Sequence, residues 1–374
     1  MTKKKSLHIL AFNIPFPANY GGVIDVFYKL IALHKIGINI HLHCFEYGRK
    51  HAHILEKYCT SIHYYKRTSG IKHFFSPIPY FVETRASNVL LSRLIEHPFP
   101  ILSEGIHCIK TILAPELKHR KKYLRAHNIE RDYYFQLFKN ESHFLNKIYF
   151  FSEYLKLIKF EQKAKLFDGI FSISKSDHVF FSKWSRSYHI RAFHSNQKIQ
   201  SKIGLGKYAL YHGNLSVNEN IKAALFLIKT VFNTLSLPLI IAGKNPNSKI
   251  LNAAKPHSHI SVIENPIDNQ MNDLISEAQM VLLPTNQPTG IKLKLIESLY
   301  RGRYCVVNQQ MIGHTELNSF CHIANSPKEW INTIDHLKER TFSQADLNHR
   351  KSIESIFNNE QEAQKIFNIL FDEK

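Results

Sequence analysis

The stretch between residues 280 and 302 most constrains what this chain can fold into, because it reads as strand, tight loop and helix in direct succession. Residues 280–283 form an apolar run typical of a buried strand, and Gly302 stands where the following helix has to end. Thr289 and Gly290 stand where that helix begins, and a helix start offers unpaired N–H groups and the positive end of a dipole. Lys292 and Lys294 add positive charge there, so the loop predicts a binding site for a diphosphate.

Glu297 follows this loop by one to two helical turns, where its carboxylate can accept hydrogen bonds from hydroxyl groups. A diphosphate site beside a hydroxyl acceptor suits a sugar nucleotide. The alternatives are a solvated helix face for Lys292 and Lys294 and an ordinary surface position for Glu297. Because the two lysines are two residues apart, we expect them to point in different directions.

The length of 374 residues is too great for one ordinary core and predicts two domains of about 150 to 200 residues each. No run approaches the roughly 18 uncharged apolar residues of a membrane span, and no signal-peptide core follows the first lysines, so we expect a cytoplasmic protein. The five cysteines lack CxxC spacing and indicate neither a disulfide framework nor a zinc site.

The formal net charge of +19 is concentrated in the first half of the chain. Residues 1–187 hold 29 Lys and Arg against 14 Asp and Glu, whereas residues 188–374 hold 20 against 16. This asymmetry indicates an anionic partner, which could be nucleic acid, acidic lipid headgroups or a phosphate-bearing substrate. One basic group is predicted to contact an anionic membrane surface or an acceptor phosphate. The alternative is an ordinary solvated surface. The group comprises Lys118, Arg120, Lys121, Lys122 and Arg125.

The spacing of apolar residues predicts two successive series of strands and helices, typical of doubly wound α/β sheets. We expect an N-terminal domain at 1–187, a linker at 188–206, a second domain at 207–345 and a C-terminal helix within 346–374 that packs back on the first domain. The strands are expected at 6–13, 38–45, 100–102, 123–126, 169–174, 208–212, 237–242, 259–263, 280–283 and 304–308.

Helical periodicity predicts four further helices besides the one that contains Glu297, at 23–35, 141–167, 220–232 and 268–278, and a last one near 353–371. The stretch 141–167 is rich in Phe, Tyr, Leu, Ile and Lys. Its aromatic stripe is either core or a membrane-facing surface, and core packing is the interpretation we favour for most of it.

Five short motifs carry a resemblance that covers most of the chain. The chain resembles a GT-B glycosyltransferase, and within that fold it is similar to the large retaining family 4, or group 1. The motifs are Tyr20-Gly21-Gly22, His127-Asn128, Tyr211-His212-Gly213-Asn214, Ala242-Gly243-Lys244, and residues 289–297 with Gly302. The resemblance implies two Rossmann-like domains that face a central cleft.

For the first domain, the resemblance implies that Gly21 and Gly22 let the backbone approach the donor diphosphate or the acceptor; a plain tight turn is the alternative. It places His127 opposite the transferred sugar and acceptor, although with 23 histidines in the chain a bystander is easily chosen. Weaker acceptor candidates are Glu104, His107 and Asn128.

For the second domain, the resemblance implies that Gly213, Asn214 and Lys244 line the nucleotide. The backbone of Thr289, Gly290 and Ile291 would hold the diphosphate together with Lys292 and Lys294, and Glu297 would accept the ribose hydroxyls. The candidate catalytic residues are thus His127, Lys292 and Glu297.

Two positions depart from the family's pattern. The family often has two glutamates eight residues apart, but Thr289 stands eight before Glu297 and cannot act as a carboxylate. Many members follow the first strand of the second domain with an Arg and a Lys, whereas residues 214–220 contain neither. Phosphate charge would then fall on Lys244, Lys292 and Lys294.

The resemblance therefore implies a retaining glycosyltransferase that moves a sugar from a nucleotide-diphosphate sugar to a glycan or lipid-linked acceptor, in bacterial cell-surface polysaccharide synthesis. No cofactor or metal is expected. The alternatives are a non-catalytic sugar-nucleotide-binding subunit, with which Thr289 is compatible, and a nucleic-acid-binding protein, for which no recognition motif is present.

Overall fold

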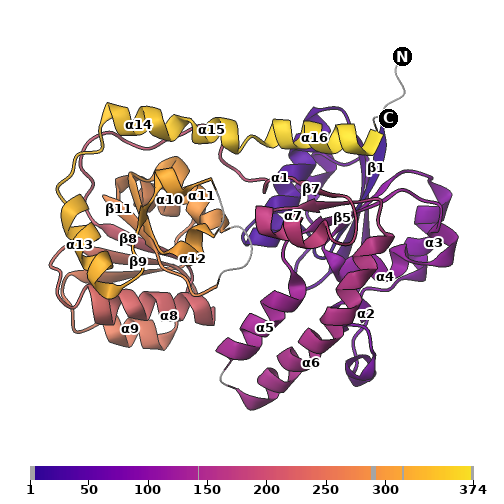
Figure 1. Ribbon diagram of the computed structural model, residues 1–374, viewed down its shortest axis with the longest axis horizontal. Helices are drawn as coiled ribbons and strands as arrows, with labels where there is room; N and C mark the ends of the chain where they lie inside the picture. Colours follow the sequence, from indigo (N-terminus) through magenta and orange to yellow (C-terminus); the bar gives the residue numbers. More distant parts are fainter. Residues whose placement is uncertain (1–4, 142, 288–291, 314–315, 372–374) are drawn as a thin grey trace. The chain divides into compact units, whose positions relative to one another are not determined.

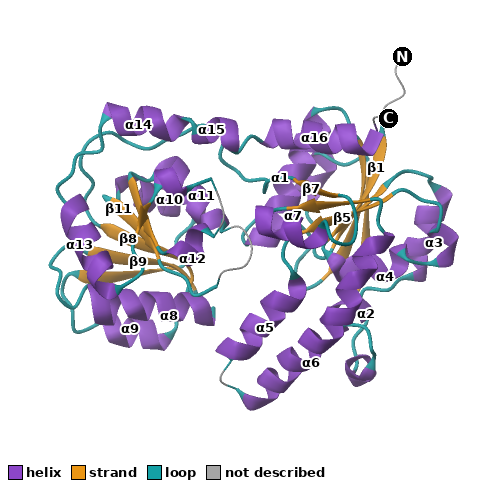
Figure 2. Cartoon of the chain, in the orientation of Figure 1, coloured by secondary structure: helices purple, strands orange, loops and turns teal. Residues whose placement is uncertain are grey.

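Two parallel β-sheets form the cores of two units in the computed structural model, which describes residues 5–141, 143–287, 292–313 and 316–371 (Figure 1). The first unit comprises the described chain up to Ser195 and again from Phe357. The second unit covers residues 196–287 and 292–356. In both units, strands alternate with helices along the chain, as Figure 2 shows. The predicted α/β class with two doubly wound sheets is confirmed.

The first unit contains a seven-stranded sheet in the order β3-β2-β1-β4-β5-β6-β7, and its paired strands are parallel. The strand order reverses between β1 and β4. The strands are β1 Ser6–Ala11, β2 Asn39–Glu46, β3 Ser61–Lys66, β4 Ile101–Glu104, β5 Lys122–Ala126, β6 Gly169–Ser172 and β7 Ser187–His189. The α-helices are α1 Gly21–Lys35, α2 Tyr80–Glu83, α3 Asn88–Glu96, α4 Ile109–Ile112, α5 Glu130–Asn140, α6 Phe144–Phe160, α7 Lys175–Phe181 and α16 Asn359–Phe371.

The second unit contains a six-stranded sheet in the order β10-β9-β8-β11-β12-β13, again with parallel pairs. Here the order reverses between β8 and β11. The strands are β8 Ala209–Asn214, β9 Leu239–Lys244, β10 Ile260–Glu264, β11 Met280–Leu283, β12 Tyr304–Val307 and β13 His322–Ile323. The α-helices are α8 Asn218–Phe226, α9 Ser248–Ala254, α10 Asp268–Glu277, α11 Leu293–Arg301, α12 Gln309–Ile312, α13 Pro327–Leu337, α14 Gln344–Lys351 and α15 Ile353–Ile356.

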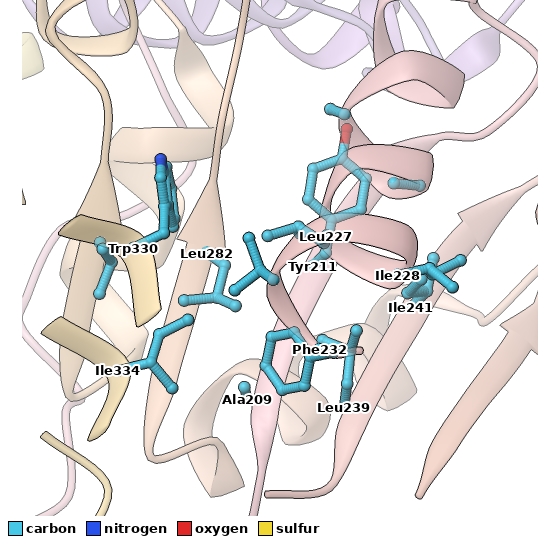
Figure 3. Packing of buried hydrophobic residues seen from close by; sticks show 14 of the residues in the cluster. Ala209, Tyr211, Leu227, Ile228, Phe232, Leu239, Ile241, Leu282, Trp330 and Ile334 are labelled. Atoms are coloured by element: carbon cyan, nitrogen blue, oxygen red, sulfur yellow. The ribbon is translucent and has the colours of Figure 1, made fainter. Parts of the chain in front are cut away.

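Apolar residues on both faces of the strands explain why the sheets are parallel and covered by helices. In the second unit, Tyr211 of β8 and Leu282 of β11 lie in one cluster with Phe232, which follows α8 and a π-helical turn, and with Trp330 of α13 (Figure 3). The Tyr211 hydroxyl donates to the Asn220 side chain at 3.1 Å, so this large buried ring keeps its polar atom satisfied. The cluster fixes the sheet edge from which the loops after β8 and β11 emerge.

The predicted helix 141–167 is wrong in its extent. The structure divides this region into α6 and a 3₁₀ helix, Glu161–Leu166, and places α5 before α6 as the first half of a helical hairpin. Figure 1 shows the hairpin projecting from the sheet of the first unit. Residues 130–140 have dense aromatic and charged residues with no narrow apolar stripe, which is why their periodicity did not indicate a helix.

The ends of the first unit also differ from expectation. The predicted linker 188–206 contains the last two residues of β7, a short edge strand whose Ser, Tyr and His give no clear period. The predicted last helix is interrupted at Phe357 and Asn358, where the Asn358 side chain accepts from the backbone N–H groups of Glu360 and Gln361, both at 3.0 Å, and so caps the start of α16. Helix α16 packs on α1 and contributes Ile366 to the core of the first unit. Strands β3 and β13 were also missed.

Among the described residues, no helix is both long and apolar enough to cross a membrane.

Histidines gather on the face of the first sheet that α3 partly covers. His8, His41, His43, His63 and His97 line a cavity of about 210 Å³ together with Arg93 and Glu96. Ring nitrogens of His8 and His43 lie 2.9 Å apart, and His43 also pairs with the Tyr65 hydroxyl at 2.8 Å. Burial lowers the pKa of His8 to about 4; the hydrogen bond to the His97 carbonyl opposes this shift, and the nearby His41 and Arg120 add to it.

Acidification should therefore weaken the first unit. Below about pH 6.5 the unfolded chain protonates His8, whereas the folded protein does so only near pH 4, so stability is present above pH 6.5 and falls as the pH drops towards 4. For His8 alone the loss is on the order of 3 kcal/mol. The free energy of unfolding, measured with urea at about pH 7.5 and about pH 5, should decline less for His8→Gln than for wild type. The variant His53→Gln changes an exposed histidine and is the control, so its decline should match that of wild type. An equal decline in all three proteins would contradict this assignment.

Candidate functional site

The predicted site residues lie at the carboxyl ends of the strands in both sheets, next to the two points where strand order reverses. In the first unit these ends carry the start of α1, Glu104 of β4 and His127 after β5. In the second unit they carry the loop after β8 and the residues that lead into α11. Ligands of open parallel sheets bind outside such reversal points.

Lys292 and Lys294 are anchored to the start of α8 in the second unit. Lys294 Nζ donates to Asn220 Oδ1 at 3.2 Å and lies 5.3 Å from the centre of the Tyr211 ring. Lys292 Nζ lies 3.9 Å from Glu219 Oε1, and the Thr285 hydroxyl donates to the same carboxylate. Two ammonium groups therefore gather beside one carboxylate at the reversal point of this sheet.

The expectation that the two lysines point in different directions is wrong. Lys292 precedes the first residue of α11 and has an extended backbone, so helical spacing does not apply to it, and both lysines interact with Glu219. Burial lowers the pKa of Lys294 to about 8; Glu219 opposes this shift and Lys292 reinforces it. A cation held partly out of water in this way interacts more strongly with an arriving anion than an exposed lysine does.

Glu297 lies in the middle of α11, four residues before its last residue, Arg301, and Gly302 follows the helix as predicted. Burial raises the pKa of its carboxyl group; Arg301 opposes the shift and Asp268 adds to it. Among the described residues, no hydrogen bond or ion pair to the Glu297 side chain is found, in contrast to Glu219. The half-buried carboxyl group is thus an acceptor that no other described residue occupies.

Three further predicted positions meet where β8 and β9 end. Asn214 and Lys244 are register partners at the last position of these strands, and both side chains are exposed. Gly213 precedes Asn214, and its carbonyl oxygen would lie 1.8 Å from a Cβ placed on Gly243. Gly243 is therefore required by the close approach of two backbones. Thr289, Gly290 and Ile291 lie outside the described residues.

Gly243 and Gly21, which belong to two different motifs, should respond very differently to an added methyl group. Gly243→Ala should cost on the order of 1 to 3 kcal/mol or more, since its Cβ would overlap the Gly213 carbonyl. Gly21→Ala should change stability little, because nothing lies within 4 Å of the position its Cβ would take. Thermal unfolding of both variants checks this, and a stable Gly243→Ala protein would contradict the backbone argument.

A buried ion network surrounds the predicted residues of the first unit. Arg125 donates to both oxygens of Asp25, through Nη2 at 2.8 Å and Nε at 3.1 Å. Lys29 Nζ bridges Asp25 Oδ2 at 3.0 Å and Glu104 Oε2 at 2.8 Å. Burial alone would raise the pKa of the Asp25 carboxyl, but Arg125 and Lys29 hold it well below its usual range. The Phe193 backbone N–H also donates to Asp25, at 2.9 Å, which ties the segment after β7 to α1.

His127 and Glu104, predicted to share one edge, do come together. His127 Nε2 lies 3.2 Å from Glu104 Oε2, and His127 Nδ1 lies 3.9 Å from Asp25 Oδ2. The imidazole is therefore oriented by two carboxylates that are themselves bonded to cations. The second Glu104 oxygen, Oε1, is buried without a hydrogen-bond partner among the described residues.

Asp25, Glu104 and His127 present ligand atoms within 4.8 Å of one another, a separation that could suit a metal ion. Their chemistry argues against one, since Lys29 and Arg125 already donate to the same carboxylates and would repel a further cation.

The structure gives less support to two other acceptor candidates of the first unit, His107 and Asn128. The His107 ring packs 5.0 Å from Phe12 and 4.5 Å from Phe81, and burial holds its pKa well below the usual value, so it belongs to the core and is not a solvated loop residue. Asn128 is half-buried in the loop before α5.

The paired glycines after β1 have different surroundings. A Cβ on Gly22 would lie 2.7 Å from Phe12 Cζ, so Gly22 makes room for that ring at the start of α1. Gly21 is the first residue of α1 and has open space around it. Phe12 also meets His127 edge to face at 5.9 Å, which links the glycine motif to the imidazole.

The basic group predicted to meet a membrane or an acceptor phosphate is largely occupied within the first unit. Arg125 is fully buried, as described above, and Lys122 Nζ donates to the Leu117 carbonyl at 3.0 Å. Arg120 donates to the carbonyls of Leu94, at 2.6 Å, and of His97, at 2.7 Å. That prediction is wrong for these three residues, because neighbouring main-chain carbonyls and Asp25 bind their charges.

Sequence reasoning missed Asp25, Lys29 and Glu219. The first two lie four residues apart within an apolar helix, and a buried-face Asp and Lys at that spacing is a signal that could have been used. Glu219 gave no such signal, since an acidic residue in the first turn of a helix is ordinary.

Residues 206–340 match the family model described as "Glycosyl transferases group 1". A Klebsiella pneumoniae relative, an "Uncharacterized 44.6 kDa protein in cps region", is 25% identical over 391 residues, which cover 93% of this chain and 98% of the relative.

Among solved structures, a variant of S. aureus TarM in complex with fondaparinux, alpha-GlcNAc-glycerol and UDP superposes with a TM-score of 0.69 at 9% identity, over 98% of this chain and 100% of that one. The lipopolysaccharide outer core galactosyltransferase WaaB, in its apo form, gives a TM-score of 0.62 at 12% identity, over 98% and 99% of the two chains.

Proposed function

We propose that this chain, which has the GT-B fold and carries a group 1 glycosyltransferase domain at residues 206–340, transfers a sugar from a nucleotide-diphosphate sugar to a glycan or lipid-linked acceptor with retention of anomeric configuration. The observation that carries the proposal is the pair of ammonium groups of Lys292 and Lys294 at the reversal point of the second sheet, with the carboxyl group of Glu297, which no other described residue occupies, further along α11. The setting that we propose is cytoplasmic synthesis of bacterial cell-surface polysaccharide, in line with the cps-region relative.

The chemistry follows from where charge develops. As the bond from the sugar C1 to the diphosphate breaks, negative charge grows on the leaving phosphate, and Lys292 and Lys294 stabilise it without moving. The acceptor hydroxyl oxygen bonds C1 on the same face, and its proton passes to the departing phosphate oxygen. No metal is required by this scheme, because ammonium groups supply the positive charge. Glu297 binds the ribose hydroxyls of the donor.

In the proposed reaction, His127 contacts the acceptor. Glu104 orients the imidazole through Nε2 at 3.2 Å, and Nδ1, which lies 3.9 Å from Asp25, is the ring nitrogen that can bond a sugar hydroxyl. Gly21 leaves the start of α1 open beside it.

Nucleotide binding is the first test. Thermal unfolding should be screened with UDP, GDP, ADP, CMP and dTDP and with their common sugars. One base should raise the midpoint by roughly 2 to 4 °C at a hundredfold excess over Kd. Release of that nucleotide from its sugar in the presence of a glycan or lipid-linked acceptor then establishes transfer. Binding without release on any acceptor would instead identify a non-catalytic subunit, and no shift with any nucleotide would overturn the proposal.

A further inference from the structure

The α5–α6 hairpin exposes an apolar stripe for which neither the fold nor the proposed reaction accounts. Phe144, Ile148, Phe151 and Leu155 of α6 are 72%, 52%, 40% and 49% exposed. Their spacing of four, three and four residues places them on one face of the helix. Leu145, beside Phe144, is 67% exposed. Scattered apolar residues on a surface are ordinary, but a continuous stripe on a projecting helix indicates an interaction surface.

The other faces of α6 are already covered within the first unit. Helix α5 packs along one side, where the ring of Phe135 lies 4.9 Å from Tyr154 and that of Tyr134 lies 6.1 Å from Phe150. On another side, the buried Glu153 accepts from the Tyr80 backbone N–H at 2.7 Å. The hairpin is therefore a packed element, and its exposed stripe is what remains after internal packing is complete.

A second segment with exposed apolar side chains packs beside the stripe, on the side of α6 that carries Tyr149 and Lys156. The 3₁₀ helix Ile71–Phe75 is held against α6, since Lys156 Nζ donates to the Phe74 carbonyl at 2.8 Å and the Phe74 ring lies 5.7 Å from Tyr149. Within it, Ile71 is 77% and Phe75 83% exposed. Both segments thus present large apolar side chains to solvent from neighbouring positions.

Positive charge predominates around the stripe. Residues 130–166 hold seven Lys and Arg against five Asp and Glu, and three of those five acids, Glu130, Glu153 and Glu161, are buried. Lys139 and Lys147 lie over the rings of Phe135 and Phe138, at 4.5 and 5.2 Å, so ammonium groups border the stripe directly. Apolar side chains rimmed by lysines match the boundary between acyl chains and anionic headgroups.

We propose that the stripe of α6 and the 3₁₀ helix Ile71–Phe75 together form a docking surface for an anionic phospholipid bilayer, into which their apolar side chains insert. A second copy of the chain fits less well, because a two-fold contact through this face would bring like-charged lysines together. The surface differs from the basic group at residues 118–125, whose side chains are largely bound internally. The inference goes beyond the transfer reaction, and its test contains no nucleotide, so either proposal can fail alone.

Sedimentation with vesicles tests the surface. The full chain should bind vesicles of phosphatidylcholine with about one quarter phosphatidylglycerol, and bind more weakly to phosphatidylcholine alone or at high salt. The double variant Phe144→Ser with Ile148→Ser should bind at least roughly tenfold more weakly. Val179→Ser is the matched control, because Val179 is a 60% exposed apolar residue on α7 of the same unit and its variant should bind like wild type.

A second variant keeps the test decisive if the double variant folds poorly. Ile148→Trp should shift its fluorescence to shorter wavelength when anionic vesicles are added, while wild type, with Trp184 and Trp330 only, should not. No binding by wild type, equal binding by the double variant, or no shift from Ile148→Trp would each overturn the proposal. A dimer of wild type that the double variant abolishes, without vesicle binding, would show that the face joins two copies instead.

Discussion

Asp25→Ala should destabilise the first unit by about 3 to 5 kcal/mol, because it removes the carboxylate shared by two buried cations. Asp25 is 1% exposed and accepts from Arg125, from Lys29 and from the backbone of Phe193. Without it, the Arg125 guanidinium keeps two carbonyl contacts but loses its counter-charge in a site that water does not reach. Urea unfolding followed by the fluorescence of Trp184, in a Trp330→Phe background, reports the first unit separately.

The matched control is Glu360→Ala, which removes an ion pair from the same unit at its surface. Lys35 and Glu360 lie 2.9 Å apart, and their side chains are 48% and 64% exposed. Solvent screening limits such a pair to about 1 kcal/mol or less. A midpoint for Asp25→Ala that falls no further than that of Glu360→Ala would show that the buried network contributes little to stability.

The network also shows where sequence reasoning reaches its limit in this fold. Runs of apolar residues predicted most strands within a few residues, since a parallel sheet buries both faces of each strand and leaves a strong signal. Arg125 lies within β5 and Glu104 ends β4, and the sequence alone could not say that Asp25 and Lys29 of α1 satisfy both charges. That pairing depends on β1, β4 and β5 becoming neighbours, which is a property of the topology.

The sequence did not predict the short edge strands, for a different reason. Strand β7 has three residues and β13 has two, too few for an alternating pattern to be distinguished from loop. In the α5–α6 hairpin, aromatic residues lie on the buried and the exposed faces alike, so composition could not separate core from surface. The structure resolves this ambiguity: Leu157 is buried while Phe144 is exposed on the same helix.

For the candidate site of the second unit, the sequence indicated residues but not how they are arranged. The sequence indicated Lys292, Lys294 and Glu297, since a strand, a loop and a helix with those charges make a distinctive order. It gave no sign of Glu219, which approaches from the start of α8 and partly neutralises the lysines. Glu219 lies 3.9 Å from Lys292 while Asn220 accepts from Lys294, and a diphosphate would compete with the Glu219 carboxylate for the positive charge.

Glu297→Ala should weaken donor binding by about 1 to 3 kcal/mol, or roughly five- to 150-fold, because it removes a charged acceptor from two ribose hydroxyls. Isothermal titration with the nucleotide found in the thermal screen measures this. Glu297→Gln keeps one acceptor oxygen and should fall between wild type and Glu297→Ala. Glu329→Ala, on the exposed start of α13, is the control and should bind like wild type.

The pattern of loss distinguishes the roles that Glu297 can have. If it binds ribose, the free nucleotide diphosphate and the full sugar nucleotide should lose affinity by the same factor, since both contain the ribose. A loss confined to the sugar nucleotide would place Glu297 against the transferred sugar instead. Unchanged affinity for both ligands, with an unaltered unfolding midpoint, would refute the ribose assignment and leave Lys292 and Lys294 as the groups from which a donor site has to be argued.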